Sequence, residues 1–295
     1  MTMNFGRIWG ARRDRGRPLP PGIERPLYVV GPVRGEAVLL ERMVSRVLTE
    51  MARRGAGRRR ITTGRREPAA DLVLIGNHLG GGTDGVAVLD LIREIASEPR
   101  LRTTALLGPQ EYRVGRFLGG QCDGRRWLRG GGIAFLAACG IAPGRGLDQG
   151  VLRAALIEAL GPRRAMLDAM APSARFGNVL VSFSGGDPLL PPAQQSAEVL
   201  VLGPEVGRYG RRADGLWSVH AGTLAGDDAV PGAEETPDAS SSLGPSIGIC
   251  TGAHFAHRLA ALRIEPSGEQ AILTVENSAE DPMLGKLANL TSAVA

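Results

Sequence analysis

Short apolar runs that end in glycine, alternating with segments of helical periodicity, constrain the fold of this sequence most strongly. The runs at 27–31, 71–76 and 103–108 each end in a glycine turn. Apolar residues recur at helical spacing in 36–51 and again in 86–97. Strands that alternate with helices predict an α/β fold with a mainly parallel sheet, whose functional loops lie at the carboxyl ends of the strands.

The middle of the chain is expected to be helical and the last third to return to strands. Helical periodicity is firmest in 151–170, and we expect a helical insertion at about 125–172 that covers one edge of the sheet. Further strands are predicted at 178–185, 216–222, 246–252, 259–266 and 270–275. The last two resemble a hairpin that turns through Ser267 and Gly268.

The composition divides the chain into one large domain with two tails. Residues 1–25 form an Arg/Gly/Pro-rich tail that cannot build a core by itself, and 279–295 form a C-terminal tail. The domain is expected to span 26–278, with a flexible acidic loop at about 226–244. No transmembrane segment or export signal is indicated, so the expected location is cytoplasmic.

The positive charge suggests nucleic acid only weakly. The net charge of +5 comes almost entirely from arginine, with Lys286 as the only lysine. Basic residues cluster at 7–17 and at 53–66, and aromatic residues are scarce around the second cluster. We therefore favour solvated loops over a site for nucleic acid or another polyanion.

The three cysteines indicate neither a disulfide framework nor a structural zinc site. Cys122, Cys139 and Cys250 are an odd number of widely spaced residues without a CxxC pair. We expect all three to be buried or incidental thiols.

Six glycine-containing blocks occur in order along the chain. They are GPVRG at 31–35, GNHLGGG at 76–82, GPQE at 108–111, SFSGGDP at 182–188, AGT at 221–223 and CTGA at 250–253. In order and spacing they resemble the GDxHG, GDxVDRG, GNHE, VHAGxxP, GHT and DTGA motifs of the bacterial serine/threonine phosphoprotein phosphatases, within the calcineurin-like metallophosphoesterase superfamily. The resemblance extends from about Leu27 to Val275 and implies a four-layer α/β/β/α sandwich with mixed sheets.

The resemblance also implies a two-metal site whose ligands this sequence lacks. Such a site needs carboxylate, imidazole or amide oxygen ligands. The corresponding positions are Pro32, Arg34, Asn77, Pro109, Phe183 and Gly222. The general-acid histidine falls on Gln110, and the phosphate-binding arginines fall on Gly81 and Gly203. We therefore expect no catalytic residue, no metal ligand and no cofactor, and we call these positions, apart from Gly203, a vestigial pocket.

Two other readings of the pocket stay open. Other side chains on neighbouring loops offer a rebuilt metal site: His78, Asp84, Glu111, Asp187 and His220. Alternatively, Arg34 binds a phosphate or carboxylate with the help of the backbone amides of Gly80, Gly81 and Gly82. Arg34 would otherwise be a structural cation that pairs with Asp187 or Glu111.

Three functional hypotheses follow, and the first is our expectation. The chain is a non-enzymatic pseudophosphatase that binds a protein partner as a scaffold, regulator or assembly subunit. The alternatives are a metal-independent binder of a phosphorylated ligand or polyanion, which uses Arg34 and the arginines of 58–66, and a metallophosphoesterase with relocated metal ligands.

Overall fold

The structure of the 295-residue chain is a computed structural model. It describes residues 19–55, 61–62, 65–82, 84–142, 148–203, 212–223, 245–250, 253 and 257–276. Residues 1–18 of the predicted N-terminal tail, the predicted acidic loop at 226–244 and the predicted C-terminal tail lie outside the described residues.

The first sheet is mixed and has five strands in the order β11-β10-β1-β4-β5. Its strands are β1 Leu27–Val30, β4 Ala70–Leu74, β5 Leu101–Ala105, β10 Arg258–Ile264 and β11 Gln270–Glu276. β1, β4 and β5 are parallel, whereas β10 is antiparallel to both β1 and β11. The predicted hairpin is confirmed, because the Glu265 amide donates to the Glu269 carbonyl across the turn.

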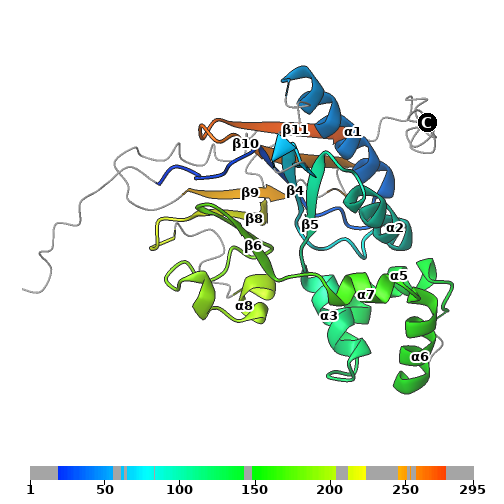
Figure 1. The fold of residues 1–295 in the computed structure, drawn as a ribbon. Helices are drawn as coiled ribbons and strands as arrows, with labels where there is room; N and C mark the ends of the chain where they lie inside the picture. The colour runs from blue at the N-terminus through cyan, green and yellow to red at the C-terminus, as the bar shows by residue number, and fades with distance from the viewer. Residues whose placement is uncertain are drawn as a thin grey trace, which may run out of the picture.

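Helices α1 Ala37–Arg53 and α2 Gly85–Ala96 cover one face of this sheet (Figure 1). Alternate residues of β1 serve two cores, as the pleat of a strand requires. Tyr28 and Val30 pack toward the helices, while Leu27 and Val29 pack on the opposite face of the sheet.

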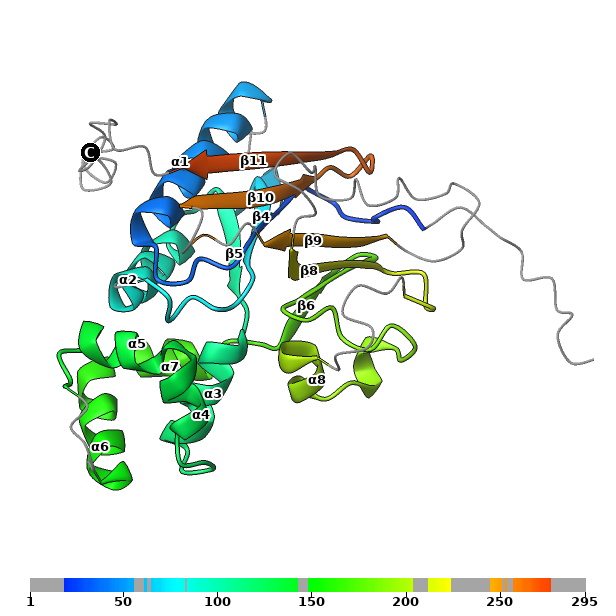
Figure 2. The same ribbon diagram turned by 180° about the vertical axis from the view of Figure 1, so that it is seen from behind.

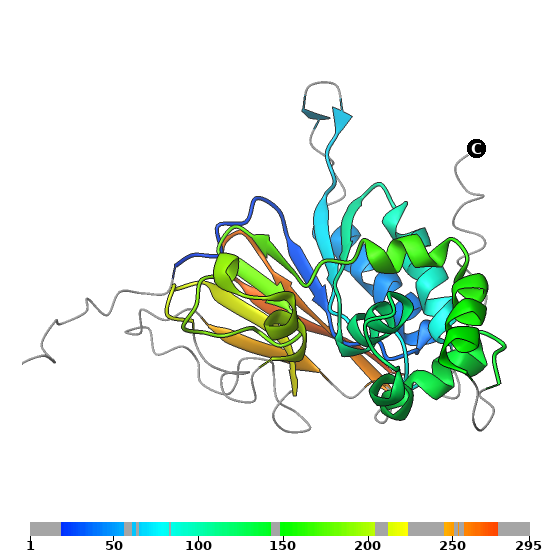
Figure 3. The same cartoon turned by 90° about the horizontal axis from the view of Figure 1, so that it is seen from below.

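The second sheet is also mixed and has the order β6-β7-β8-β9. Its strands are β6 Ser173–Phe176, β7 Val179–Ser182, β8 Trp217–Thr223 and β9 Ser246–Cys250. Val179 and Val181 share a core with Val29 and Val73 of the first sheet. The short helix α8 Ala197–Leu202 lies beside the second sheet, away from α1 and α2 (Figure 3). The predicted four-layer sandwich with mixed sheets is therefore confirmed.

The remaining helices form a separate unit at one end of the molecule (Figure 2). Its elements are α3 Pro109–Leu118, α4 Arg125–Trp127, the π-helical turn η1 Leu128–Gly132, α5 Ile133–Ala138, α6 Gln149–Leu160 and α7 Arg163–Asp168. We call residues 109–168 the helical unit. Its core also takes in Leu79 and, from α2, Leu89, and within that core the rings of Phe117 and Trp127 stack with centroids 5.6 Å apart.

Some elements were not expected from the sequence. β6 pairs with β7, and a small hairpin joins β2 Ile61–Thr62 to β3 Arg65–Arg66. A 3₁₀ turn spans Pro192–Gln194. The stretch 19–25 packs on the folded domain, with Ile23 in the core between the sheets.

Candidate functional site

Three loops meet where β1, β4 and β5 end. The loop after β1 is bonded to the loop after β4, because the Arg34 amide donates to the Asn77 carbonyl at 2.7 Å and the Gly35 amide donates to the His78 carbonyl at 2.9 Å. The Gly82 amide returns a bond to the Arg34 carbonyl at 2.7 Å. Parallel strands direct these loops to one edge of the sheet, where ligands bind in folds of this kind.

The loops after β4 and β5 cross at two glycines. A Cβ atom added to Gly76 would lie 2.0 Å from the Gly108 amide nitrogen, and one added to Gly108 would lie 2.0 Å from the Asn77 nitrogen. Only glycine permits so close an approach of two backbones. Arg34 and Asn77 beside this crossing have φ angles of +54° and +58°, a left-handed conformation that is uncommon outside glycine.

Glu111 holds the loops after β4 and β5 together through hydrogen bonds to their backbone amides. Its side chain is 2% exposed, and its carboxylate accepts bonds from the amides of Asn77, Leu79 and Gly108 at 2.7, 2.9 and 2.9 Å. The side chain of Asn77 accepts a further bond from the Gln110 amide at 3.1 Å. Charge-assisted bonds to backbone amides are among the stronger hydrogen bonds in proteins. Glu111 and Asn77 therefore hold the loops in place.

Three residues of these loops carry buried polar atoms without a hydrogen-bond partner: Arg34 Nε, His78 Nδ1 and Gln110 Oε1. His78 is fully buried, and its Nε2 lies 3.0 Å from the Leu106 carbonyl, so Nε2 carries the proton. Burial lowers the pKa of His78, while the charge of Glu111 opposes that effect. Buried polar atoms are usually satisfied, so three orphans on adjoining loops are unusual.

The second sheet carries the other two positions of the vestigial pocket. Phe183 follows β7 and packs against the core between the sheets, and its carbonyl accepts from the Ala221 amide at 3.0 Å. The Gly222 amide donates to His220 Nδ1 at 3.0 Å. In the described part of the chain, no hydrogen bond joins these positions to Arg34 or to the loops after β4 and β5.

The residues present do not fit a pair of divalent metals. Both ring nitrogens of His220 are engaged, Nδ1 by Gly222 and Nε2 by the Ser246 hydroxyl at 3.0 Å. Glu111 is committed to backbone amides. Among the described residues, no three His, Cys, Asp or Glu side chains gather as a metal site. The rebuilt metal site therefore has no ligand set in this part of the chain.

Arg34 lacks the ionic partners that a structural cation would need. Within the described ranges it makes no ion pair with Asp187 or Glu111. Arg212 is the buried cation of the Asp187 loop, because its guanidinium donates to the Leu190 carbonyl and to Asp214. The Gly82 amide is used by Arg34's own carbonyl, which leaves Gly80 and Gly81 for the amide nest that the sequence suggests.

Sequence reasoning missed three features around this site. The anchoring role of Glu111 could have been sought in its position three residues after Gly108, which is a helix-capping spacing. The buried Arg212 had no recognisable signal. The arginines of the helical unit carried a recognisable sequence signal, because Arg113 and Arg116, and likewise Arg126 and Arg129, are spaced at i, i+3. The cysteines are free thiols; Cys122 is exposed, while Cys139 and Cys250 are half-buried.

The two mixed sheets, their helices and the loops gathered at the ends of β1, β4 and β5 form a metallophosphoesterase-type α/β/β/α sandwich. Among solved structures, the chain is similar to a protein described as a "putative diadenosine tetraphosphatase". The TM-score is 0.51 at 14% identity, over 88% of this chain and 97% of that one. At this identity the likeness shows the fold alone.

A second match is a serine/threonine phosphatase from Saccharomyces cerevisiae with similarity to human phosphatase PP5. Its TM-score is 0.43 at 11% identity, over 88% of this chain and 82% of that one. No family model and no curated protein matches the sequence. In the described part of the chain, no helix is both long and apolar enough to cross a membrane.

Proposed function

We propose that the chain is a catalytically inactive phosphatase-like protein that binds another protein as a scaffold, regulator or assembly subunit. One observation carries the proposal: the loops after β1, β4 and β5 are held in a fixed arrangement, but the residues at the metal-ligand positions of these loops cannot bind two divalent metals. The crossing of Gly76 and Gly108 and the anchor at Glu111 fix the loops. Arg34 and Asn77 are then held where ligands would be needed.

Electrostatics opposes a two-metal centre at these loops. Two dications need several anionic ligands, and each ligand must be deprotonated. Arg34 brings a positive charge instead, and Asn77 offers only a neutral oxygen, which already accepts from the Gln110 amide. An uncompensated buried charge is strongly destabilising. Because these loops keep a fixed arrangement without metal ligands, we infer that they serve for binding and not for hydrolysis.

The experiment combines metal analysis with a phosphoester assay on one sample. The full chain is incubated with excess manganese, desalted and assayed for metal and for hydrolysis of p-nitrophenyl phosphate. We expect neither retained manganese nor turnover. About two metals per chain, with turnover that is lost in Asn77→Ala and kept in the exposed control His257→Ala, would overturn the proposal.

A second candidate is a metal-independent binder of a phosphorylated ligand at Arg34. The observation that favours it is the buried, unpartnered Nε of Arg34, in a loop whose backbone is hydrogen-bonded to that of Asn77 and His78. A phosphate oxygen accepts from a guanidinium, whereas Gln110 Oε1 and His78 Nδ1 are both acceptors and would each need a water or a protonated phosphate oxygen.

Calorimetric titration with inorganic phosphate tests this candidate. The expected result is a measurable heat in the wild-type chain that Arg34→Ala abolishes. Arg46→Ala serves as the control, since Arg46 is an exposed residue of α1. Equal phosphate binding by the two variants would remove the candidate.

A further inference from the structure

Four arginines on α3, α4 and η1 lack the acidic partners that most other described arginines have. By contrast, Arg102 of β5 pairs with Asp71, and Arg163 of α7 pairs with Asp90. Among the described residues, no carboxylate forms an ion pair with the following four, which we call the arginine cluster: Arg113, Arg116, Arg126 and Arg129. Arg126 and Arg129 are exposed, and Arg113 and Arg116 are half-buried.

The fold brings these like charges together. Arg113 and Arg116 are i, i+3 neighbours on α3, and Arg126 and Arg129 have the same spacing along α4 and η1. Residues at this spacing adjoin on a helix surface, where like charges repel. The stacked rings of Phe117 and Trp127 hold the two segments together.

Arg113 lies at the junction between the cluster and the loops described above. A Cβ atom added to Gly130 would lie 3.8 Å from Arg113 Nη1 and 3.6 Å from Gln110 Nε2. The side chain of Gln110 donates to the Gly130 carbonyl. Burial and the positive charge of Arg126 both lower the pKa of Arg113. The guanidinium groups of the cluster therefore repel one another, and an anionic ligand would relieve that repulsion.

Nearby carboxylates do not neutralise the cluster. On α3 itself, Glu111 is committed to backbone amides. In the adjoining loop Asp123 pairs with Arg125, and on α7 Asp168 pairs with Arg164. The cluster is thus a positively charged surface open to a ligand.

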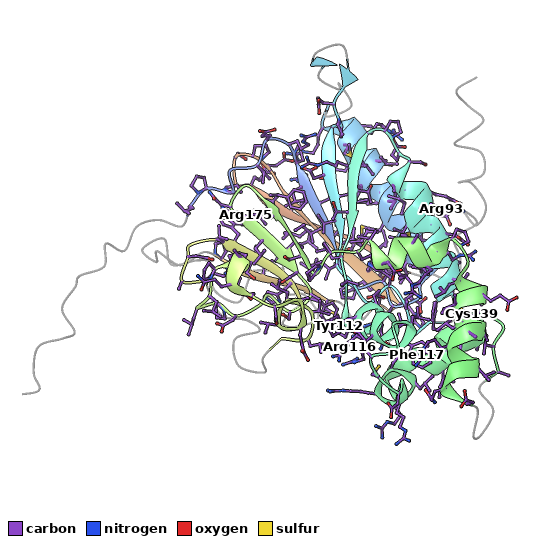
Figure 4. All side chains as sticks on the ribbon, turned by 60° about the horizontal axis from the view of Figure 1, so that its bottom comes forward. Arg93, Tyr112, Arg116, Phe117, Cys139 and Arg175 are labelled. Atoms are coloured by element: carbon purple, nitrogen blue, oxygen red, sulfur yellow. The ribbon has the colours of Figure 1, made fainter. Side chains whose placement is uncertain are left out.

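The side chains around the cluster favour a protein ligand over nucleic acid. Figure 4 shows Tyr112, Arg116 and Phe117 on α3. The Arg116 guanidinium lies 5.9 Å from the centre of the Tyr112 ring and so occupies one face of that ring, and Phe117 is buried and cannot stack on bases. Large apolar side chains of the same helical unit are exposed: Ile133, Val151 and Ile157. Arginine is enriched in protein–protein interfaces.

We propose that the arginine cluster is the docking surface for an acidic segment of a protein partner. Guanidinium groups bind carboxylates in a bidentate fork, and two pairs of them on adjoining helical segments suit a run of acidic residues. The proposal rests on the proposed protein-binding function and names the chemistry of the partner.

Fluorescence anisotropy with a fluorescein-labelled hexaglutamate peptide tests the surface. The full chain is compared with Arg113→Glu/Arg126→Glu and with Arg46→Glu/Arg53→Glu. The second pair makes the same charge change at exposed positions of α1, away from the helical unit (Figure 1). We expect affinity to fall about tenfold or more in the first variant and to change little in the second. Added salt should weaken binding by the wild type.

A milder variant covers the case in which the charge reversal prevents folding. Arg116→Gln/Arg129→Gln removes two charges at exposed or half-buried positions and should also weaken peptide binding. Absence of peptide binding, or equal loss in the cluster and α1 variants, would overturn the proposal. Tighter binding of a hexathymidylate strand through the same arginines would do so too. The hydrolysis assay is read separately, so failure here leaves the inactive-phosphatase proposal standing.

Discussion

His78 is a fully buried neutral imidazole whose environment has no place for a second ring proton. Its Nε2 proton is donated to the Leu106 carbonyl, and Nδ1 has no hydrogen-bond partner. Protonation at Nδ1 would put a positive charge in a site with little solvent, and burial lowers the pKa accordingly. Folding therefore excludes a proton that the unfolded chain accepts.

This exclusion makes stability depend on pH in a defined direction. Because burial lowers the pKa of His78, below the ordinary histidine pKa of 6.5 the unfolded chain binds a proton at residue 78 more readily than the folded chain does. The free energy of unfolding should therefore fall as pH decreases from 6.5, by up to about 1.4 kcal/mol per pH unit from this group. Urea unfolding at pH 7.5 and pH 5.5 measures the loss.

His78→Gln should lose about 1 kcal/mol less over that interval than the wild type. His257→Gln is the matched control, because His257 is exposed. If His78→Gln and the wild type lost equal stability, the imidazole would be protonated in the folded chain and the argument would fail.

At the scale of elements, the crossing of the loops after β4 and β5 is the tightest backbone approach around the site. It lets Glu111, at the start of α3, reach amides on both loops. Gly76 is required by the close approach of two backbones, whereas Gly115 is not. A Cβ atom at Gly76 would meet the Gly108 backbone, whereas one at Gly115 within α3 would meet nothing within 4 Å.

Alanine substitutions at these two glycines should have opposite effects. Gly76→Ala should lower the free energy of unfolding by roughly 3 kcal/mol, because two backbones must separate. Gly115→Ala should raise it by about 0.5–1 kcal/mol, because alanine is the better helix former. Thermal and urea unfolding measure both. A stable Gly76→Ala protein would show that the crossing is looser than described.

Elements with strong patterns were predictable from the sequence, and weakly patterned ones were not. The periodicities of 36–51 and 86–97 correspond to α1 and α2, and the apolar run at 27–31 corresponds to β1. β6 was missed because its four residues, SARF, include a serine and an arginine and only Phe176 is buried. Its stability comes from pairing with β7, a tertiary contact.

At the scale of the whole molecule, the order of the glycine blocks predicted the sandwich, but not what surrounds its site. Arg34 and Asn77 could be placed beside each other because both end neighbouring parallel strands. The arginine cluster could not be recognised as unpaired, since pairing depends on which carboxylates the fold brings near. The same limit applied to Glu111, whose acceptor role needs the amides of Asn77 and Leu79 from the loop after β4.

The position of β1 has a consequence for how the chain acquires its structure. β1 is the first described strand in the sequence, yet it lies between β4 and β10, and its register with β10 joins Leu27 to Ile264. Such distant pairing slows folding, since a long loop must close before the contact forms. During synthesis, the first sheet cannot close until most of the chain has left the ribosome, so β1 remains without its second neighbour until late in translation.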